Sequence, residues 1–516
     1  MPVQRRPPMP KLPPFASADS PASAKQKRPY YLLLFFALFA TLLIALHLQL
    51  LTLPFYWDEQ GQFIPTALDL LRTGAWVAHS TVPNVHPPGV EAYLVLWYKL
   101  FGFSVPVTRI VMLMLAAAGL LLTFLLAIEL SRMAEGAPAF LPPLFLLASP
   151  LFYTQSMMAQ LDMPAMVLTL LAILLLLKER YLASAIACVA LALTKETGLV
   201  TSAIFGLALL LRRDRKRAFF FVPPALALGV WLVVLHDKTG YWLGDPGFAH
   251  YNVEYALHPV RILVSILRRA YYLFFAEFRW IGTIVLIFTV RRCPAFRTWR
   301  WRITLSASGA TVLLVSVLGG AELERYLLPV LPIFYVLVSV GLTVLPKFAG
   351  IAASAGLLLG LCLNVFWNPP YPFPYENNYA MVDFVRLQQV AASYAEHRFR
   401  VRTIATAWPF SAALRSPDYG FVSHRLKTVE TSDFHLKSIR ALPPESFDVL
   451  ITYTRTWMPE TGLAAMPLVR RFVARFYEWE PDLTPSDCEL LGLEPEASWT
   501  RGGQQITIYA RKNLGF

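Results

Sequence analysis

Residues 105–130 read VPVTRIVMLMLAAAGLLLTFLLAIEL, an apolar run long enough to cross a lipid bilayer as a single helix. Runs of the same kind recur from about residue 30 to residue 366, and 56% of all 516 residues are hydrophobic. Soluble globular domains do not reach this composition. The residues after 366 have the composition of an ordinary soluble domain. The sequence therefore predicts an α-helical polytopic membrane domain followed by a small C-terminal α/β domain.

Counting outward from that run, we expect about eleven membrane spans within residues 30–366. Gly89–Phe101 is apolar but too short to span, so we expect it to lie at the interface or to re-enter the membrane. The expected spans cover residues 31–53, 105–130, 139–155, 163–177, 181–194, 198–211, 218–235, 271–290, 303–319, 326–345 and 348–366.

Basic residues decide the orientation of these spans. The net charge is +13, but Lys and Arg collect in short segments between apolar runs, such as Arg212–Arg217. This distribution follows the positive-inside rule, so it indicates membrane topology and no nucleic-acid partner. We expect residues 1–29 to form a disordered basic tail in the cytoplasm, and the loop 54–90 and the domain 367–516 to lie outside. A bacterial inner membrane, with the C-terminal domain in the periplasm, is the expected setting.

Ionisable residues stand next to the expected outer ends of several spans. Asp58 and Glu59 follow the first span, and Asp162 begins a later one. Lys195 and Arg325 stand at two further outer boundaries. Each has a structural explanation when taken alone: a solvated helix end, a helix cap, a local ion pair at a turn or a snorkelling side chain. Together they place carboxylates and cations on one side of the membrane.

These residue types suit the transfer of a sugar from a lipid phosphate to a hydroxyl group. A carboxylate can take the proton of the acceptor hydroxyl, and cations can hold the leaving phosphate and stabilise its growing charge. A guanidinium binds a phosphate or a carboxylate through two parallel hydrogen bonds, which suits Arg325 to such a contact. The lipid tail of such a donor lies in the bilayer, so its sugar stands at the level of these residues.

Three ordered segments carry a resemblance to a known family. They are WDE at residues 57–59 with LRTGAW at 71–76 and HPP at 86–88, then LDMP at 161–164, and finally TKE at 194–196 with ERYLLPVLP at 324–332. In their order, spacing and topology, residues 30 to 366 resemble the membrane glycosyltransferases of the protein O-mannosyltransferase type, which include the lipid A aminoarabinose transferases.

The resemblance implies a GT-C fold and an inverting glycosyltransferase that uses a polyprenyl-phosphate sugar, with the site formed by the first outer loop. It implies that Asp58 is the catalytic base, with Glu59 beside it, and that Asp162 is a second acidic site residue. It implies that Lys195 and Arg325 bind the donor phosphate. The acceptor is then a hydroxyl of a protein, a lipid or a polysaccharide, and the transferred sugar is a hexose or a pentose.

The chain departs from the family pattern at three places. Gln60–Phe63 stands where family members usually carry a Tyr, His86 where a Lys is expected, and Gln160 where an Arg is often found. His86 still offers a hydrogen bond to the donor phosphate, with a charge that depends on pH. These departures leave the reaction type standing and leave the sugar, the acceptor and some phosphate contacts open.

Further polar and aromatic residues near the outer boundary are candidates for the lining of a cavity. An interfacial aromatic belt or a frayed helix end is the alternative explanation for several of them. Carboxylates with nearby histidines are compatible with a divalent metal ion, but no spacing requires one, and no cofactor is implied. The lining candidates are Glu196, Glu324, Tyr326, Tyr241, Trp242, Glu277 and Arg279.

The C-terminal domain alternates between helix and strand signals. Residues 378–397 and 463–477 have helical patterns, and residues 401–405, 447–453 and 505–510 read as short strands. We expect this domain to help to bind the acceptor, to cover the active site or to stabilise the membrane domain. A transporter or flippase for a lipid-linked sugar is the alternative function, although the sequence shows no convincing internal repeat of the kind typical of transporters.

Overall fold

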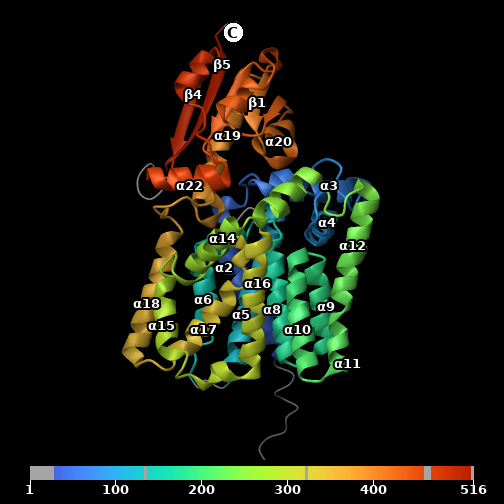
Figure 1. Ribbon diagram of the computed structural model, residues 1–516, viewed down its shortest axis with the longest axis vertical. Coiled ribbons are helices and arrows are strands. Elements are labelled where there is room, and N and C mark those ends of the chain that lie inside the picture. Colours follow the sequence, from blue (N-terminus) through green and yellow to red (C-terminus); the bar gives the residue numbers. More distant parts are fainter. Residues whose placement is uncertain (1–27, 133–135, 320–322, 458–465, 513–516) are drawn as a thin grey trace, which may run out of the picture.

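The computed structural model describes residues 28–132, 136–319, 323–457 and 466–512. The expected basic tail, residues 1–29, therefore lies almost entirely outside the described residues. Most of the described chain is helical, and the helices form a bundle with a small α/β domain on one end (Figure 1). The predicted combination of a helical membrane domain with a C-terminal sheet is confirmed.

Helix α5 (Val105–Leu130) forms the centre of the bundle. More of it is buried than of the other long apolar helices, and α2, α6 and α8 pack around it. Apolar residues on all sides of this helix explain why it occupies the interior. The other helices of the bundle are α2 (Arg28–Leu46), α6 (Leu141–Ala148), α7 (Pro150–Gln155), α8 (Asp162–Leu177), α9 (Tyr181–Ala192), α10 (Leu199–Leu211), α11 (Arg215–Ala218), α12 (Pro223–Thr239), α16 (Trp299–Leu318), α17 (Leu331–Leu342) and α18 (Lys347–Asn364).

Only some of these helices have the length of a full membrane span. Within the described residues four helices are long and apolar enough, namely residues 105–130, 215–239, 299–318 and 347–364. The pair α14 (Pro259–Phe274) and α15 (Arg279–Thr289) makes a fifth if it is counted as one span. Five shorter apolar helices lie among them. The expectation of about eleven spans therefore stays a prediction.

One expected span differs in shape from the observed helices. Residues 271–290 were expected to form one span, but this range is divided between α14 and α15, which meet at an angle of 86°. The backbone turns between them because Glu277 and Phe278 adopt positive φ angles of 54° and 62°. Non-glycine residues rarely adopt this conformation, so the helix ends there. The expectation of one continuous helix over these residues was wrong.

The first outer loop, residues 54–90, and the segment that follows it fold into short helices at the end of the bundle that carries the α/β domain (Figure 1). These are η2 (Glu59–Phe63), α3 (Ile64–Thr73) and α4 (Gly89–Phe101). As expected, α4 is a separate short helix, and its Leu96, Leu100 and Phe101 side chains are exposed. Exposed apolar side chains on a helix at this level suit a position in the membrane interface.

Three basic segments meet at the opposite end of the bundle, where α11 lies (Figure 1). The guanidinium of Arg212 lies 4.5 Å from the ring centroid of Trp299, and that of Arg217 lies 4.6 Å from the ring of Tyr181. These contacts hold the loops before α9, α11 and α16 together. The bundle therefore has a basic end and an end that carries the α/β domain, and the assignment of the basic end to the cytoplasm stays a prediction.

The α/β domain contains a five-stranded sheet in the order β2-β1-β3-β5-β4. Strand β1 pairs in parallel with β2 and β3, whereas β5 pairs antiparallel with β3 and β4. Helix α19 (Ala380–Arg398) packs against β4 and β5. Three strands were expected, and the outer strands β2 and β4 were not. The strands are β1 (Thr403–Ala407), β2 (Lys427–Thr431), β3 (Val449–Tyr453), β4 (Leu493–Arg501) and β5 (Gln504–Arg511).

Aromatic side chains join the α/β domain to the first outer loop. The ring of Phe384, from α19, lies 5.6 Å from that of Tyr56 and 5.8 Å from that of Trp57. Trp408 stands edge-on to Trp57, with ring centroids 6.0 Å apart. A Cβ atom on Gly61 would lie 2.1 Å from the Trp408 ring, so this indole rests directly on the loop backbone. The domain is therefore packed onto the loop that carries the first predicted site residues.

Candidate functional site

Four segments far apart in the sequence bring charged residues to the domain-bearing end of the bundle. Asp58 immediately precedes η2, and Asp162 is the first residue of α8, where the helix dipole favours a carboxylate. Arg325 lies in η8 (Glu324–Leu327) before α17. Glu376 lies in η9 (Tyr375–Asn377), between the last helix of the bundle and α19.

Arg325 is the hub of this cluster. Its guanidinium donates a hydrogen bond to the Asp58 carboxylate, and its Nη1 donates to Oε2 of Glu376 at 2.8 Å. Its Nε lies 3.0 Å from Oδ2 of Asp162. Nη1 also donates to Oε1 of Gln160 at 2.9 Å. Each of the three nitrogens of this buried guanidinium is therefore paired with a carboxylate.

Lys195 adds a second cation on the far side of Asp162. Its Nζ lies 2.5 Å from Oδ1 of Asp162, and it stands 4.2 Å from the ring centroid of Tyr326. Lys195 is 7% exposed and Asp162 2% exposed, so solvent screens this pair little. The structure thus brings together Asp58, Asp162, Lys195 and Arg325, the residues that the sequence analysis assigned to one outward-facing site. These contacts place the four side chains in one cluster.

Glu59 points away from this cluster, although it is the neighbour of Asp58. Its Oε1 accepts hydrogen bonds from Arg109 Nη1 at 2.5 Å and from the Ala159 backbone at 2.7 Å, and its Oε2 accepts one from the Tyr56 backbone at 2.8 Å. Glu59 and Arg109 are 0% and 1% exposed. In this structure Glu59 holds the loop on α5 through Arg109 and lies apart from the Arg325 cluster, and its predicted role beside Asp58 stays a prediction.

Arg109 completes that buried anchor and was not singled out from the sequence. Besides Glu59, its guanidinium donates to the backbone carbonyls of Leu53, Pro54 and Met157 at 3.2, 2.9 and 2.9 Å. It therefore ties the end of the first span and the turn before α8 to the central helix. A charged residue four positions into a long apolar run was the available signal.

Glu376 is the site residue that the sequence analysis missed. It is 2% exposed, and its Oε1 has no hydrogen-bond partner among the described residues. Burial, together with the charges of Asp58 and Asp162, raises the pKa of this carboxyl to about 7, against the lowering effect of Arg325. The carboxyl of Glu376 therefore changes its charge near neutral pH.

A second layer of polar contacts joins the link between the two domains to the cluster. Glu324 accepts hydrogen bonds from Arg268 Nε at 2.6 Å and from Asn377 Nδ2 at 2.9 Å. Tyr326 lies beneath the cations, with its ring centroid 5.8 Å from the Arg325 guanidinium carbon. Glu324 and Tyr326, both predicted to line the cavity, therefore border the Arg325 cluster.

His86 occupies a neighbouring site of its own. Its Nδ1 lies 2.9 Å from Oε2 of Glu196, and its ring stands edge-on to that of Phe248. Because Glu196 follows Lys195 directly, the turn before α10 sends one side chain to Asp162 and the next to His86. Within the described residues, His86 does not contact Arg325.

The remaining lining candidates are not brought to Arg325. Glu277 accepts a hydrogen bond from Arg279 Nη1 at 2.6 Å, and both lie at the bend between α14 and α15. Tyr241 and Trp242 are 54% and 57% exposed beyond the end of α12, and Trp242 stacks on His236. In the described part of the chain, no group of three or more His, Cys, Asp or Glu side chains is arranged to hold a metal ion.

Comparison with known proteins gives a match only at the level of structure. No protein-family model and no curated protein matches the sequence. ArnT from Cupriavidus metallidurans bound to undecaprenyl phosphate is 14% identical and superposes with a TM-score of 0.54, over 93% of this chain and 98% of that chain. The same ArnT in the apo state gives 13% identity and a TM-score of 0.53, over 91% and 97% of the two chains. The protein has a GT-C fold.

The GT-C fold confirms the resemblance that was inferred from the sequence, at the level of the fold. ArnT is a lipid A aminoarabinose transferase, one of the proteins included in that resemblance. The archaeal oligosaccharyltransferase AglB from Archaeoglobus fulgidus, in complex with an inhibitory peptide and a dolichol-phosphate, is 10% identical with a TM-score of 0.49, over 82% of this chain and 69% of that chain.

Proposed function

We propose that this protein is an inverting glycosyltransferase that moves a sugar from a polyprenyl-phosphate carrier to a hydroxyl acceptor at the outer face of a membrane. The observation that carries the proposal is the buried Arg325 guanidinium with Lys195 near it, facing Asp58 and Asp162. Cations that can bind a phosphate and carboxylates that can accept a proton thus lie in direct contact with one another. A GT-C fold shared with an ArnT bound to undecaprenyl phosphate supports the choice of donor.

The cations are held in place before a donor arrives. Carboxylates and phosphates accept hydrogen bonds from a guanidinium with the same fork geometry. A donor phosphate can therefore replace the Asp58 carboxylate on Arg325 without moving the guanidinium far. Lys195, on the other side of Asp162, then adds a second positive charge to stabilise the leaving phosphate.

Release of Asp58 from Arg325 gives the reaction its base. The acceptor hydroxyl oxygen forms a bond to the anomeric carbon, while the bond from that carbon to the phosphate oxygen breaks. The hydroxyl proton passes to the Asp58 carboxylate, and the electron pair leaves with the polyprenyl phosphate. A single displacement of this kind inverts the configuration at the anomeric carbon. One carboxylate oxygen of Asp162 holds Lys195 in position, and the other holds Arg325.

The first experiment is sugar transfer by purified protein in nanodiscs, supplied with a panel of radiolabelled polyprenyl-phosphate hexoses and pentoses. Asp58→Asn is compared with Asp237→Asn, which removes an exposed carboxylate that pairs with its neighbour Lys238. We expect Asp58→Asn to abolish the release of free polyprenyl phosphate and Asp237→Asn to leave it unchanged. The labelled sugar that is consumed identifies the donor.

Two outcomes contradict this proposal in different ways. Equal turnover by wild type and Asp58→Asn removes Asp58 from the mechanism while keeping the transferase. No turnover by folded wild type with any donor and acceptor favours the alternative of a transporter or flippase. That alternative is tested with protein reconstituted in vesicles, by measuring whether the labelled lipid moves across the vesicle membrane. The bacterial inner membrane and a cytoplasmic N-terminus are tested by protease access to the α/β domain in sealed vesicles.

A further inference from the structure

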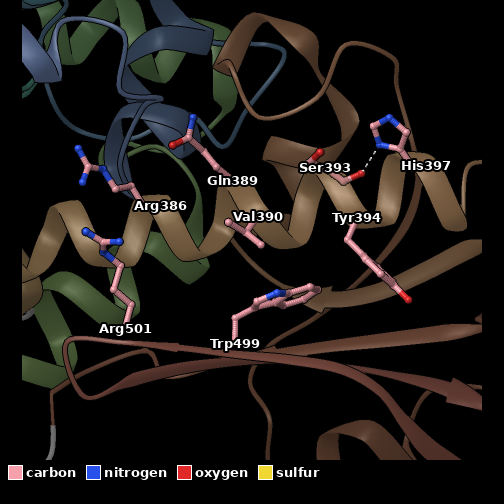
Figure 2. A pocket seen from close by; sticks show the side chains of 8 residues that line it. All are labelled: Arg386, Gln389, Val390, Ser393, Tyr394, His397, Trp499 and Arg501. Atoms are coloured by element: carbon pink, nitrogen blue, oxygen red, sulfur yellow. Dashed lines mark hydrogen bonds between the residues drawn. The ribbon is translucent and has the colours of Figure 1, made fainter.

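A groove lies in the α/β domain between helix α19 and strand β4 (Figure 2). Its volume is about 780 Å³, and it is open to solvent. None of the residues proposed above for the reaction lies in it. The groove is lined by Arg386, Gln389, Val390, Ser393, Tyr394, His397, Trp499 and Arg501.

Two arginines stand at the same end of this groove. Arg386 comes from α19 and Arg501 from the end of β4, and their guanidinium groups lie on the same side of the groove in Figure 2. Arg501 forms an ion pair with Asp383, but Arg386 makes no ion pair with a described residue. Within the described part of the chain, the two arginines thus share one carboxylate, that of Asp383, which pairs with Arg501. A carboxylate, sulfate or phosphate on a ligand would neutralise the remaining positive charge.

Beyond the arginines the groove is lined by two aromatic side chains (Figure 2). The rings of Trp499 and Tyr394 meet edge to face, with centroids 5.4 Å apart. The Tyr394 hydroxyl donates a hydrogen bond to Glu496 at 3.0 Å, which fixes the ring. Trp499 is partly exposed to the groove. An exposed indole held in one orientation offers a flat apolar surface, on which the C–H face of a sugar ring can stack.

Polar side chains follow the same face of α19. Gln389, Ser393 and His397 are spaced four residues apart, so they lie one above the other along the helix. The His397 ring nitrogen Nδ1 lies 2.7 Å from the Ser393 carbonyl, which leaves Nε2 for an outside partner. From Arg386 to His397 the helix rises by about 16 Å. The groove therefore offers hydrogen-bonding groups over a length that suits several sugar units rather than one.

The groove and the Arg325 cluster are mounted on the same segment of chain. Glu376 contacts Arg325, and Asn377 contacts Glu324, immediately before α19 begins at Ala380. The groove starts about two turns further along this helix. The groove is thus connected to the Arg325 cluster through one helix.

We propose that this groove binds an acidic polysaccharide and that this polymer is the acceptor of the transferred sugar. The second half of the statement rests on the proposed function, whereas the first half does not. Uncompensated guanidinium charge selects an anion, the indole face selects a sugar ring, and the row of polar side chains selects hydroxyl groups. Binding of the polymer raises the effective concentration of its end near Asp58 and Arg325.

Direct binding tests the groove without any transfer reaction. Wild-type protein in nanodiscs is titrated with fluorescently labelled oligogalacturonate, oligomannuronate and hyaluronan fragments, with maltohexaose as the neutral sugar and poly-glutamate as the acidic peptide. We expect at least one acidic glycan to bind, and Trp499→Ala and Arg386→Ala each to weaken it by tenfold or more. The matched controls are Trp367→Ala and Arg440→Ala, which remove exposed residues outside the groove and should change nothing.

Each other outcome overturns a defined part of the inference. Absence of binding by all three acidic glycans, or binding that Trp499→Ala and Arg386→Ala leave unchanged, overturns the groove as a glycan site. If maltohexaose binds as tightly as the acidic glycans, the groove does not require an acidic ligand. If poly-glutamate binds as tightly as they do, the groove does not select a sugar. Retained thermal unfolding transitions in the variants show that loss of binding is not loss of the fold.

A kinetic split connects the groove to the reaction. In a transfer assay with the acidic glycan as acceptor, Trp499→Ala should raise the acceptor KM by tenfold or more and leave kcat and the donor KM unchanged. Groove-dependent binding without any transfer keeps the glycan site and removes the proposed function. Transfer with an acceptor KM that Trp499→Ala does not change keeps the transferase and removes the acceptor role of the groove.

Discussion

Glu376 accepts a hydrogen bond from Arg325 at 2.8 Å, so the segment that links the membrane bundle to the α/β domain enters the same cluster as Asp58 and Asp162. The link is therefore part of the candidate site rather than a passive tether. Because the carboxyl of Glu376 is buried and its pKa lies near 7, the charge balance around Arg325 changes within the physiological pH range.

The first prediction concerns the pH dependence of donor binding. As pH rises through about 7, Glu376 ionises and competes more strongly with the donor phosphate for Arg325. We expect the donor KM of the wild type to rise over this range. Glu376→Gln keeps an oxygen that accepts from Arg325 but cannot ionise, so its donor KM should stay flat. Steady-state kinetics from pH 5.5 to 8.5 measure the difference, and parallel profiles for the two proteins would contradict it.

The second prediction concerns stability. Glu376 has a folded-state pKa of about 7, above the value of 4.5 expected when the chain unfolds. The stabilising effect of the neutral carboxyl is thus fully present below about pH 4.5 and is lost as pH rises through 7, by roughly 3 kcal/mol. Glu376→Gln should remove this part of the pH dependence. Thermal unfolding in nanodiscs at several pH values checks it, and an apparent Tm that rises in the wild type over this range has the wrong sign.

The third prediction concerns the shape of the cation at position 325. Arg325 contacts Asp58, Asp162 and Glu376 through separate nitrogens, which the single nitrogen of a lysine cannot reproduce. We expect Arg325→Lys to lower kcat/KM by at least about a hundredfold, roughly 2.7 kcal/mol of transition-state stabilisation. Arg440→Lys, at an exposed arginine, is the matched control. Full activity of Arg325→Lys would show that charge alone is sufficient.

The sequence predicted the elements whose residues face lipid or the bundle core, because their apolar runs are long. Helix α5 was predicted to the residue, at Val105–Leu130. The strands β2 and β4 were missed because both lie at the edges of the sheet. β2 is short and mostly exposed or half-exposed, and β4 contains Pro495 and several exposed polar residues, so neither has the buried run that marks a central strand.

Part of the candidate site could also be predicted from the sequence. Asp58, Asp162, Lys195 and Arg325 interrupt apolar sequence at span ends, so they were visible as exceptions to the composition around them. Glu376 stands in a polar, proline-rich link, where an acidic residue is ordinary. Its position depends on how the α/β domain packs on the first outer loop, and that packing leaves no periodic signal. The opposite directions of Asp58 and Glu59 likewise depend on Arg109, fifty residues further on.

The fourth prediction separates the neighbours Asp58 and Glu59. Removing the charge of Glu59 leaves the Arg109 guanidinium buried without its counter-charge, which costs about 3–5 kcal/mol. We expect Glu59→Gln to lower the apparent Tm clearly and Asp58→Asn to leave it nearly unchanged while abolishing transfer. The double variant Glu59→Leu with Arg109→Met removes the unpaired charge but leaves the carbonyls of Leu53, Pro54 and Met157 without their donor, so it should recover only part of the lost stability. A stable Glu59→Gln protein that lacks only activity would instead place Glu59 in the reaction.

The last prediction concerns the contact between Gly61 and Trp408. A Cβ atom at position 61 would lie 2.1 Å from the Trp408 ring, so Gly61→Ala must push the indole and the α/β domain away from the first outer loop. Because Asp58 lies three residues before Gly61 and Glu376 reaches Arg325 from the link to that domain, the Arg325 cluster should open. We expect Gly61→Ala to lower kcat/KM by tenfold or more and to increase protease cleavage between the bundle and the domain. Trp408→Ala removes the obstacle, so the double variant should be more active than Gly61→Ala alone. If the two substitutions instead add independently, the domain does not hold the loop through this contact.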